Sequence, residues 1–90
     1  MIKLEIEDFL FEIKDEILSY EEFGEKAAKQ WEEKFLAWLK NDNIKKKNVK
    51  IEKEKIYYLI DDESDIFDMA DEYIYALEQN KEEEYWKNFK

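Results

Sequence analysis

The chain contains no Cys, no His, no Pro and a single Gly among its 90 residues. Without Cys there is no disulfide framework and no thiol nucleophile. Without His, neither a Ser-His-Asp triad nor a Cys-His pair can be built. One glycine and no proline leave no Gly-rich loop of the kind that cradles phosphate. We therefore expect a protein that is not an enzyme and that uses no cofactor.

Arg is also absent, so the 15 basic residues are all Lys against 25 acidic residues, and the formal net charge is −10. Lys lacks the planar fork with which Arg grips phosphate or guanine, and a negative chain repels nucleic acid at long range. There is neither an apolar run of membrane length nor a signal-peptide segment. The sequence thus disfavours direct nucleic-acid binding and membrane insertion, and it predicts a cytoplasmic protein.

Aromatic and charged residues are what the chain has in abundance, at 17% and 44% of its residues. The aromatic rings supply enough apolar area for a packed core, so we expect residues 1–90 to fold as one domain. The segment from Glu25 to Lys40 predicts the central helix. Its apolar residues recur at helical spacing on one face: Phe23, Ala27, Trp31, Phe35, Trp38 and Leu39.

Residues 1–20 predict another helix, whose main apolar stripe is Ile6, Phe9, Leu10, Ile13, Ile17 and Tyr20. Leu4, Phe11 and Leu18 are spaced by seven and predict a second stripe on this helix, which would face a neighbouring helix or a second copy of the chain. The first six residues also alternate between apolar and charged, so a short N-terminal strand is the alternative there.

The connection to the central helix contains two competing signals. Ser19 with Glu22 has the form of a capping box, whereas Gly24 would suit a left-handed residue that closes the first helix. Both interpretations leave a short turn, so the first two helices are expected to form an antiparallel pair.

The central helix is predicted to end at Lys40, because the next residues, Asn41, Asp42 and Asn43, favour a turn. Val49 and Ile51 alternate with charged residues, and Ile56, Tyr58 and Ile60 then alternate with Tyr57 and Leu59. A tight turn at Lys53-Glu54 would place Ile51 opposite Ile56 and Val49 opposite Tyr58. We predict a β-hairpin with five apolar residues on one face: Val49, Ile51, Ile56, Tyr58 and Ile60. A helical interpretation fits less well because it leaves Lys53 on the apolar side.

A third long helix is predicted from Asp61 to Gln79, with Asp62 or Ser64 as its N-cap. Its inward residues would be Ile66, Met69, Ala70, Tyr73, Ile74 and Leu77. Beyond Asn80 the apolar phase changes. Either the helix breaks there, or it continues and exposes an aromatic docking patch of Tyr85, Trp86 and Phe89.

The expected fold is α+β and mainly helical, with an antiparallel helix pair, a β-hairpin and a C-terminal helix; an all-α bundle is the alternative.

Charge is distributed unevenly along the chain. The segment from Lys40 to Lys55 carries a net charge of +4 and the remainder −14. Acidic residues gather at the start of the third helix and around Tyr75 on its outer face: Asp61, Asp62, Glu63, Asp65, Asp68, Asp71 and Glu72. Such a surface either keeps the protein soluble or docks on a basic partner with Tyr75 as an aromatic anchor.

One segment resembles a known family. Ile56-Tyr57-Tyr58 followed by Asp61-Asp62-Glu63-Ser64-Asp65 and a helix is similar to the Tyr-Tyr and acidic region of the small immunity proteins that neutralise nuclease bacteriocins. The resemblance implies a four-helix acidic protein that presents Tyr57, Tyr58, Asp61 and Asp62 to a basic nuclease. The chain lacks the proline that the family carries after its tyrosines, and its alternation indicates strands where the family has a short helix.

The sequence therefore predicts a small acidic inhibitor that covers the nucleic-acid-binding surface of a basic protein. An immunity protein or antitoxin and a phage-type antagonist of a host defence nuclease are two versions of this hypothesis. Its expected binding residues are the acidic residues named above together with Tyr75 and Tyr57. The alternative is a structural or regulatory adaptor that self-associates through Leu4, Phe11 and Leu18.

Overall fold

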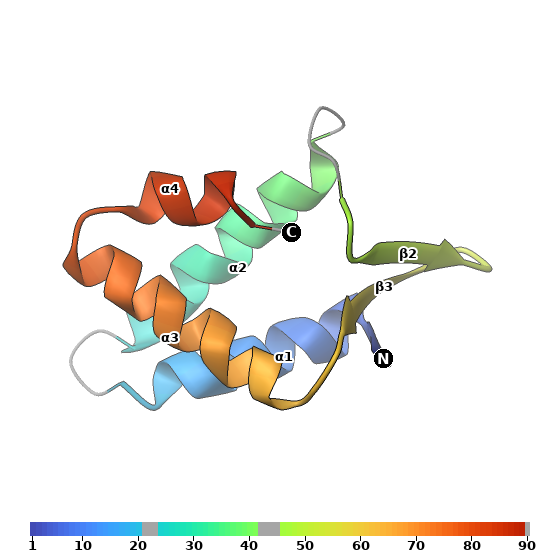
Figure 1. Ribbon diagram of the computed structural model, residues 1–90, viewed down its shortest axis with the longest axis horizontal. Helices are drawn as coiled ribbons and strands as arrows, with labels where there is room; N and C mark the ends of the chain where they lie inside the picture. Colours follow the sequence, from blue (N-terminus) through green and yellow to red (C-terminus); the bar gives the residue numbers. More distant parts are fainter. Residues whose placement is uncertain (21–23, 42–45, 90) are drawn as a thin grey trace.

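The alternating segments of the sequence form a three-stranded antiparallel sheet, and the periodic segments form four helices around the core (Figure 1). The computed structural model describes residues 1–20, 24–41 and 46–89. Its elements in chain order are β1 (Ile2–Glu5), α1 (Ile6–Leu18), α2 (Gly24–Lys40), β2 (Val49–Glu52), β3 (Lys55–Ile60), α3 (Ser64–Glu78) and α4 (Glu82–Lys87). The mainly helical α+β fold is thus confirmed, and the all-α bundle is wrong.

The N-terminus is a strand, so the prediction of a helix from residue 1 is wrong and the strand alternative is confirmed. β1 pairs with β3, with Ile2 opposite Ile60 and Leu4 opposite Tyr58, and the sheet order is β1-β3-β2. Alternation suits a sheet with one buried face better than it suits a helix. As a consequence, Leu4 packs against the core. It does not share a helical stripe with Phe11 and Leu18.

The hairpin has the predicted register. Ile51 lies opposite Ile56 and Val49 opposite Tyr58, and the turn residues Lys53 and Glu54 have φ angles of 46° and 70°. Two left-handed residues give the turn whose twist matches that of the flanking strands, although it usually contains Asn or Gly. The predicted apolar face is only partly buried. The hairpin tip extends away from the helices (Figure 1), which leaves Ile51 70% exposed and Ile56 exposed.

Helices α1 and α2 pack side by side, and the start of α2 lies close to the end of α1. Ser19 follows the end of α1, and its hydroxyl donates to the Glu16 carbonyl oxygen at 2.6 Å. Gly24 begins α2 without a positive φ, so the left-handed prediction is wrong. A Cβ on Gly24 would lie 3.0 Å from the Leu18 carbonyl oxygen, and glycine therefore permits this close approach. The predicted capping role of Glu22 lies outside the described residues.

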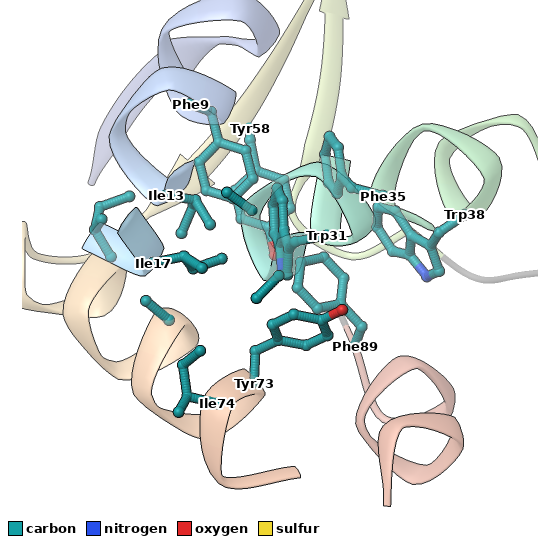
Figure 2. Packing of buried hydrophobic residues seen from close by; sticks show 14 of the residues in the cluster. Phe9, Ile13, Ile17, Trp31, Phe35, Trp38, Tyr58, Tyr73, Ile74 and Phe89 are labelled. Carbon is teal, nitrogen blue, oxygen red and sulfur yellow. The ribbon is translucent and has the colours of Figure 1, made fainter. Parts of the chain in front are cut away.

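The core is aromatic and is centred on α2, as predicted (Figure 2). Trp31 and Phe35 are stacked with ring centroids 5.0 Å apart, and Phe9 of α1 is stacked on Tyr58 of β3 at 4.2 Å. Phe89, after α4, meets Trp38 edge-on at 4.9 Å. With the buried residues of α3, four elements and the C-terminal segment share one cluster. Phe23, which was expected in this stripe, lies outside the described residues.

A break after α3 returns the chain to the core. Asn80 has a φ of 56°, and the Lys81 amide donates to the Ala76 carbonyl oxygen at 2.7 Å, which closes the end of α3. The short helix α4 then turns its aromatic side inward, with Phe89 buried and Tyr85 and Trp86 partly buried. The predicted break is confirmed, and the alternative of an exposed aromatic end is wrong.

Candidate interaction surface

The outer face of α3 carries charge of one sign. The helix contains five acidic residues and no basic residue, and its apolar residues Ile66, Ala70, Tyr73 and Ile74 are buried on the opposite side. The predicted inward stripe is confirmed, since Met69 and Leu77 also pack against the core. Asp68, Asp71 and Glu72 are exposed. The amphipathic pattern of α3 therefore directs its carboxylates outward.

Two aromatic side chains lie among these carboxylates. Tyr75 is 63% exposed, and helical spacing places it next to Asp71 and Glu72. Phe67 is 50% exposed and lies one turn before Asp71. Phe67 was missed in the sequence, although its position outside the inward stripe was a usable signal. We call Phe67, Asp68, Asp71, Glu72 and Tyr75 the α3 surface.

The acidic cluster at the start of α3 is partly engaged by the backbone. The Asp65 carboxylate accepts from the amides of Asp61 and Asp62 at 2.8 and 3.3 Å, and the Asp62 carboxylate accepts from the Ser64 amide at 3.3 Å. Asp62 and Asp65 thus stabilise the first turn. The N-cap residue is Glu63, so the predicted N-cap at Asp62 or Ser64 is wrong by one residue, and Glu63 makes no side-chain cap.

Asp71 is held by a residue that follows α1. Its carboxylate accepts a hydrogen bond from the Tyr20 hydroxyl, and this bond raises the pKa of Tyr20 above its ordinary value. A tyrosine that donates to a carboxylate is favoured in its neutral form. Asp71 therefore has a structural role that Asp68 and Glu72 do not share.

The carboxylates of α3 are not neutralised by neighbouring lysines. Over the described ranges 1–20, 24–41 and 46–89, the ion pairs are Lys3–Glu52, Lys14–Glu32, Lys50–Glu52 and Lys55–Glu5, and none of them involves α3. Three of these four pairs lie on the sheet. The acidic charge of α3 is thus left to solvent or to a partner.

Tyr57 is separate from the α3 surface. It lies on the outer face of the sheet, where the Lys3 ammonium is 4.8 Å from its ring centroid and reaches over it to Glu52. Tyr58 points the other way and is 1% exposed, so it cannot contact a partner as the family resemblance implied. The three-stranded sheet also distinguishes this fold from the four-helix protein implied by that resemblance.

A groove lies between α3 and α4, beside the α3 surface. It has a volume of about 540 Å³, and both Glu72 and Tyr75 line it. Its other walls include Lys81 and Glu84 with the rings of Tyr85 and Phe89. The break at Asn80 creates this groove, because it folds α4 back alongside α3. The sequence showed the break but not the groove.

The described part of the chain contains no group of three or more carboxylates placed to hold a metal ion. No helix in that part is long and apolar enough to cross a membrane. No protein-family model matches the chain, and no curated protein or solved structure is significantly similar to it.

Proposed function

We propose that the protein is a small acidic inhibitor that binds a basic protein through the α3 surface. The observation that carries this proposal is a helix with five carboxylates, no cation and no ion pair to any described residue, which also exposes Phe67 and Tyr75. Solubility alone would call for carboxylates, but it would not call for two large exposed rings among them.

The physical basis is complementarity of charge followed by burial of the rings. Like charges on α3 repel one another, and a basic partner removes that repulsion while steering the encounter. Exposed aromatic side chains are the type of residue that most often anchors an interface. Fast association driven by charge and slow dissociation set by Phe67 and Tyr75 are the expected consequences.

The partner is proposed to be a protein that binds or cuts nucleic acid. Such proteins place Lys and Arg where phosphates bind, and carboxylates on α3 would occupy those positions in place of phosphate. The inhibitor acts by steric and electrostatic occlusion, without catalysis, inside the cytoplasm. Both an immunity protein or antitoxin and a phage-type antagonist of a host defence nuclease work in this way.

The binding residues divide by position. Asp68, Glu72 and Tyr75 form the proposed centre. Asp61, Asp62, Glu63 and Asp65 extend the negative charge to the start of the same helix, although Asp62 and Asp65 also cap the backbone. Tyr57 lies on the outer face of the sheet beneath Lys3 and is not included in the proposed centre.

The rival proposal is an adaptor that self-associates through α1. Leu4 was expected on that surface, but it packs against the core instead. Phe11 is 68% exposed and Leu18 is also exposed, and both line a shallow groove of about 420 Å³ beside α2. If this pair forms an interface, Phe11→Glu should convert an oligomer into a folded monomer. Sedimentation of the unchanged protein as a monomer at high concentration would eliminate the adaptor.

The test uses two charge-reversal variants with the same change in net charge. Asp68→Lys with Glu72→Lys alters the α3 surface and spares Asp71, which holds Tyr20. Asp8→Lys with Glu12→Lys alters two exposed residues of α1 that are also one turn apart. The native protein is first used to isolate a basic partner from its host, and association with that purified partner is then measured by stopped flow at several salt concentrations.

We expect the α3 variant to associate at least about tenfold more slowly at low salt, and the α1 variant to be much less affected. Native association should slow steeply as salt rises. Equal slowing of both variants would mean that only net charge matters. Unchanged association of the α3 variant would remove the proposal.

A further inference from the structure

The α3–α4 groove combines a rigid aromatic floor with carboxylates from both helices. The Tyr85 hydroxyl accepts from the Trp31 indole nitrogen and donates to the Met69 carbonyl oxygen, each at 3.1 Å. Phe89 packs edge-on against the Tyr85 ring with centroids 5.7 Å apart. Two hydrogen bonds and a ring contact fix this floor before any ligand arrives, so binding would not require it to be ordered.

The charges around this floor favour a cation. Glu72 enters from α3 and Glu84 from α4, against one ammonium group at Lys81. None of the three forms an ion pair with another described residue. Burial raises the pKa of Tyr85, and the negative charge of Glu72, which lines the same groove, adds to that effect. A cation in the groove would therefore meet both carboxylates and ring faces.

We propose that the α3–α4 groove receives an arginine side chain of the basic partner. Its guanidinium group would bind Glu72 and Glu84, and its aliphatic stem would lie along Tyr75, Tyr85 and Phe89. Arginine fits better than lysine because its planar, weakly hydrated head both stacks on rings and pairs with carboxylates. A groove of about 540 Å³ is large enough for one such side chain. This inference rests on the proposed function and names the chemistry of its central contact.

The experiment is an NMR titration of the ¹⁵N-labelled full chain with N-acetylarginine amide. N-acetylcitrulline amide serves as the matched control, because it has nearly the same shape and no charge. We expect saturable shifts of the Glu72, Tyr75, Tyr85 and Phe89 amides with the arginine compound and much smaller shifts with the citrulline compound. Absence of shifts at these amides, or equal shifts with both compounds, would overturn the proposal.

Three variants locate the binding. Glu72→Gln should weaken the arginine compound about three- to fivefold, the range of a partly exposed ion pair. Lys81→Gln should strengthen it about twofold by removing the competing ammonium group. Asp68→Asn lies one turn from Glu72 on the same helix but does not line the groove, so affinity should stay within about twofold of the native value. Equal weakening by Asp68→Asn and Glu72→Gln would mean that the arginine compound responds only to the net charge of the protein. That result would contradict binding in the groove.

The two proposals fail in distinguishable ways. If the arginine compound leaves the groove amides unshifted while partner association still depends on Asp68 and Glu72, the groove assignment is wrong and the inhibitor proposal stands. If the compound binds in the groove while partner association ignores the α3 charge reversal, the inhibitor proposal is wrong.

Discussion

The outer face of the sheet and the outer face of α3 are both charged, yet their charges are arranged in opposite ways. On the sheet, Lys3 pairs with Glu52 at 3.1 Å and Lys55 pairs with Glu5 at 3.0 Å, and each pair joins two strands. The charged side chains of α3 are all carboxylates, and none forms an ion pair with a described residue. The sheet pairs its charges internally, whereas the carboxylates of α3 have no ion-pair partner among the described residues.

This difference separates two uses of surface charge. Alternating signs on a small sheet help to set strand pairing and discourage other strands from adding to the edge. Charge of one sign on the outer face of α3 adds a cost of self-repulsion, although Asp65 and Asp71 also accept hydrogen bonds from a backbone amide and from Tyr20. A surface that opposes its own fold slightly is a better candidate for function than one that supports it.

The largest effect should come from the core that carries both surfaces. Trp31 is fully buried, stacks on Phe35 and donates to Tyr85, so Trp31→Ala should reduce the free energy of unfolding by about 3–5 kcal/mol. The total free energy of unfolding of a small domain is only about 5–15 kcal/mol, so the variant should be unfolded or nearly so. Thermal melting followed by circular dichroism measures this. Melting within a few degrees of the native protein would show that the centre of the core lies elsewhere.

Each surface also lies over a buried tyrosine, and alkali should act on both. Burial raises the pKa of Tyr58 beneath the sheet and of Tyr73 beneath α3 to about 12. The unfolded value is about 10, so between pH 10 and 12 the native state holds more protons than the unfolded state. Stability should therefore be complete below about pH 10 and fall as the pH rises through that window. Denaturant unfolding at stepped pH tests this, and a constant free energy of unfolding up to pH 12 would contradict it.

Two tyrosine-to-phenylalanine changes should sharpen the contrast between the groove and the rest of the core. Tyr85→Phe leaves the Trp31 indole nitrogen and the Met69 carbonyl without that partner, which should cost about 1–3 kcal/mol. The Tyr73 hydroxyl is buried and finds no hydrogen-bond partner among the described residues, so Tyr73→Phe should leave stability unchanged or raise it. Chemical denaturation of both variants measures the change in the free energy of unfolding. Similar losses for both would mean that the Tyr73 hydroxyl has a partner.

The smallest effects should come from single charges on the two surfaces. Lys55→Glu breaks the pair with Glu5 and should lower the melting temperature slightly, whereas Asp68→Lys relieves repulsion on α3 and should leave it unchanged or raise it slightly. Salt should reduce both differences, because it screens attraction and repulsion alike. Melting temperatures at low and at high salt show whether each substitution raises or lowers stability. If Asp68→Lys destabilises the protein as Lys55→Glu does, the charges of α3 support the fold and our contrast is wrong.

Local periodicity determined much of the fold. The stripe from Ala27 to Trp38 specified the buried side of α2, and alternation together with the tight turn at Lys53-Glu54 specified the register of Ile51 with Ile56. The change of apolar phase at Asn80 indicated the break after α3. These features are set by residues close in sequence, because the repeat of a helix or a strand fixes which side chains share a face.

Tertiary structure decided which of those faces are covered. Leu4 is drawn to the core by pairing with Tyr58 of β3, while Ile51 stays exposed because no helix reaches the hairpin tip. Tyr57 and Asp68 are near in sequence but lie on different surfaces, and the α3–α4 groove depends on the fold of α4 back alongside α3, which also brings Phe89 to Trp38. Periodicity places a side chain on its own element, but burial and binding depend on neighbours that come from distant parts of the chain.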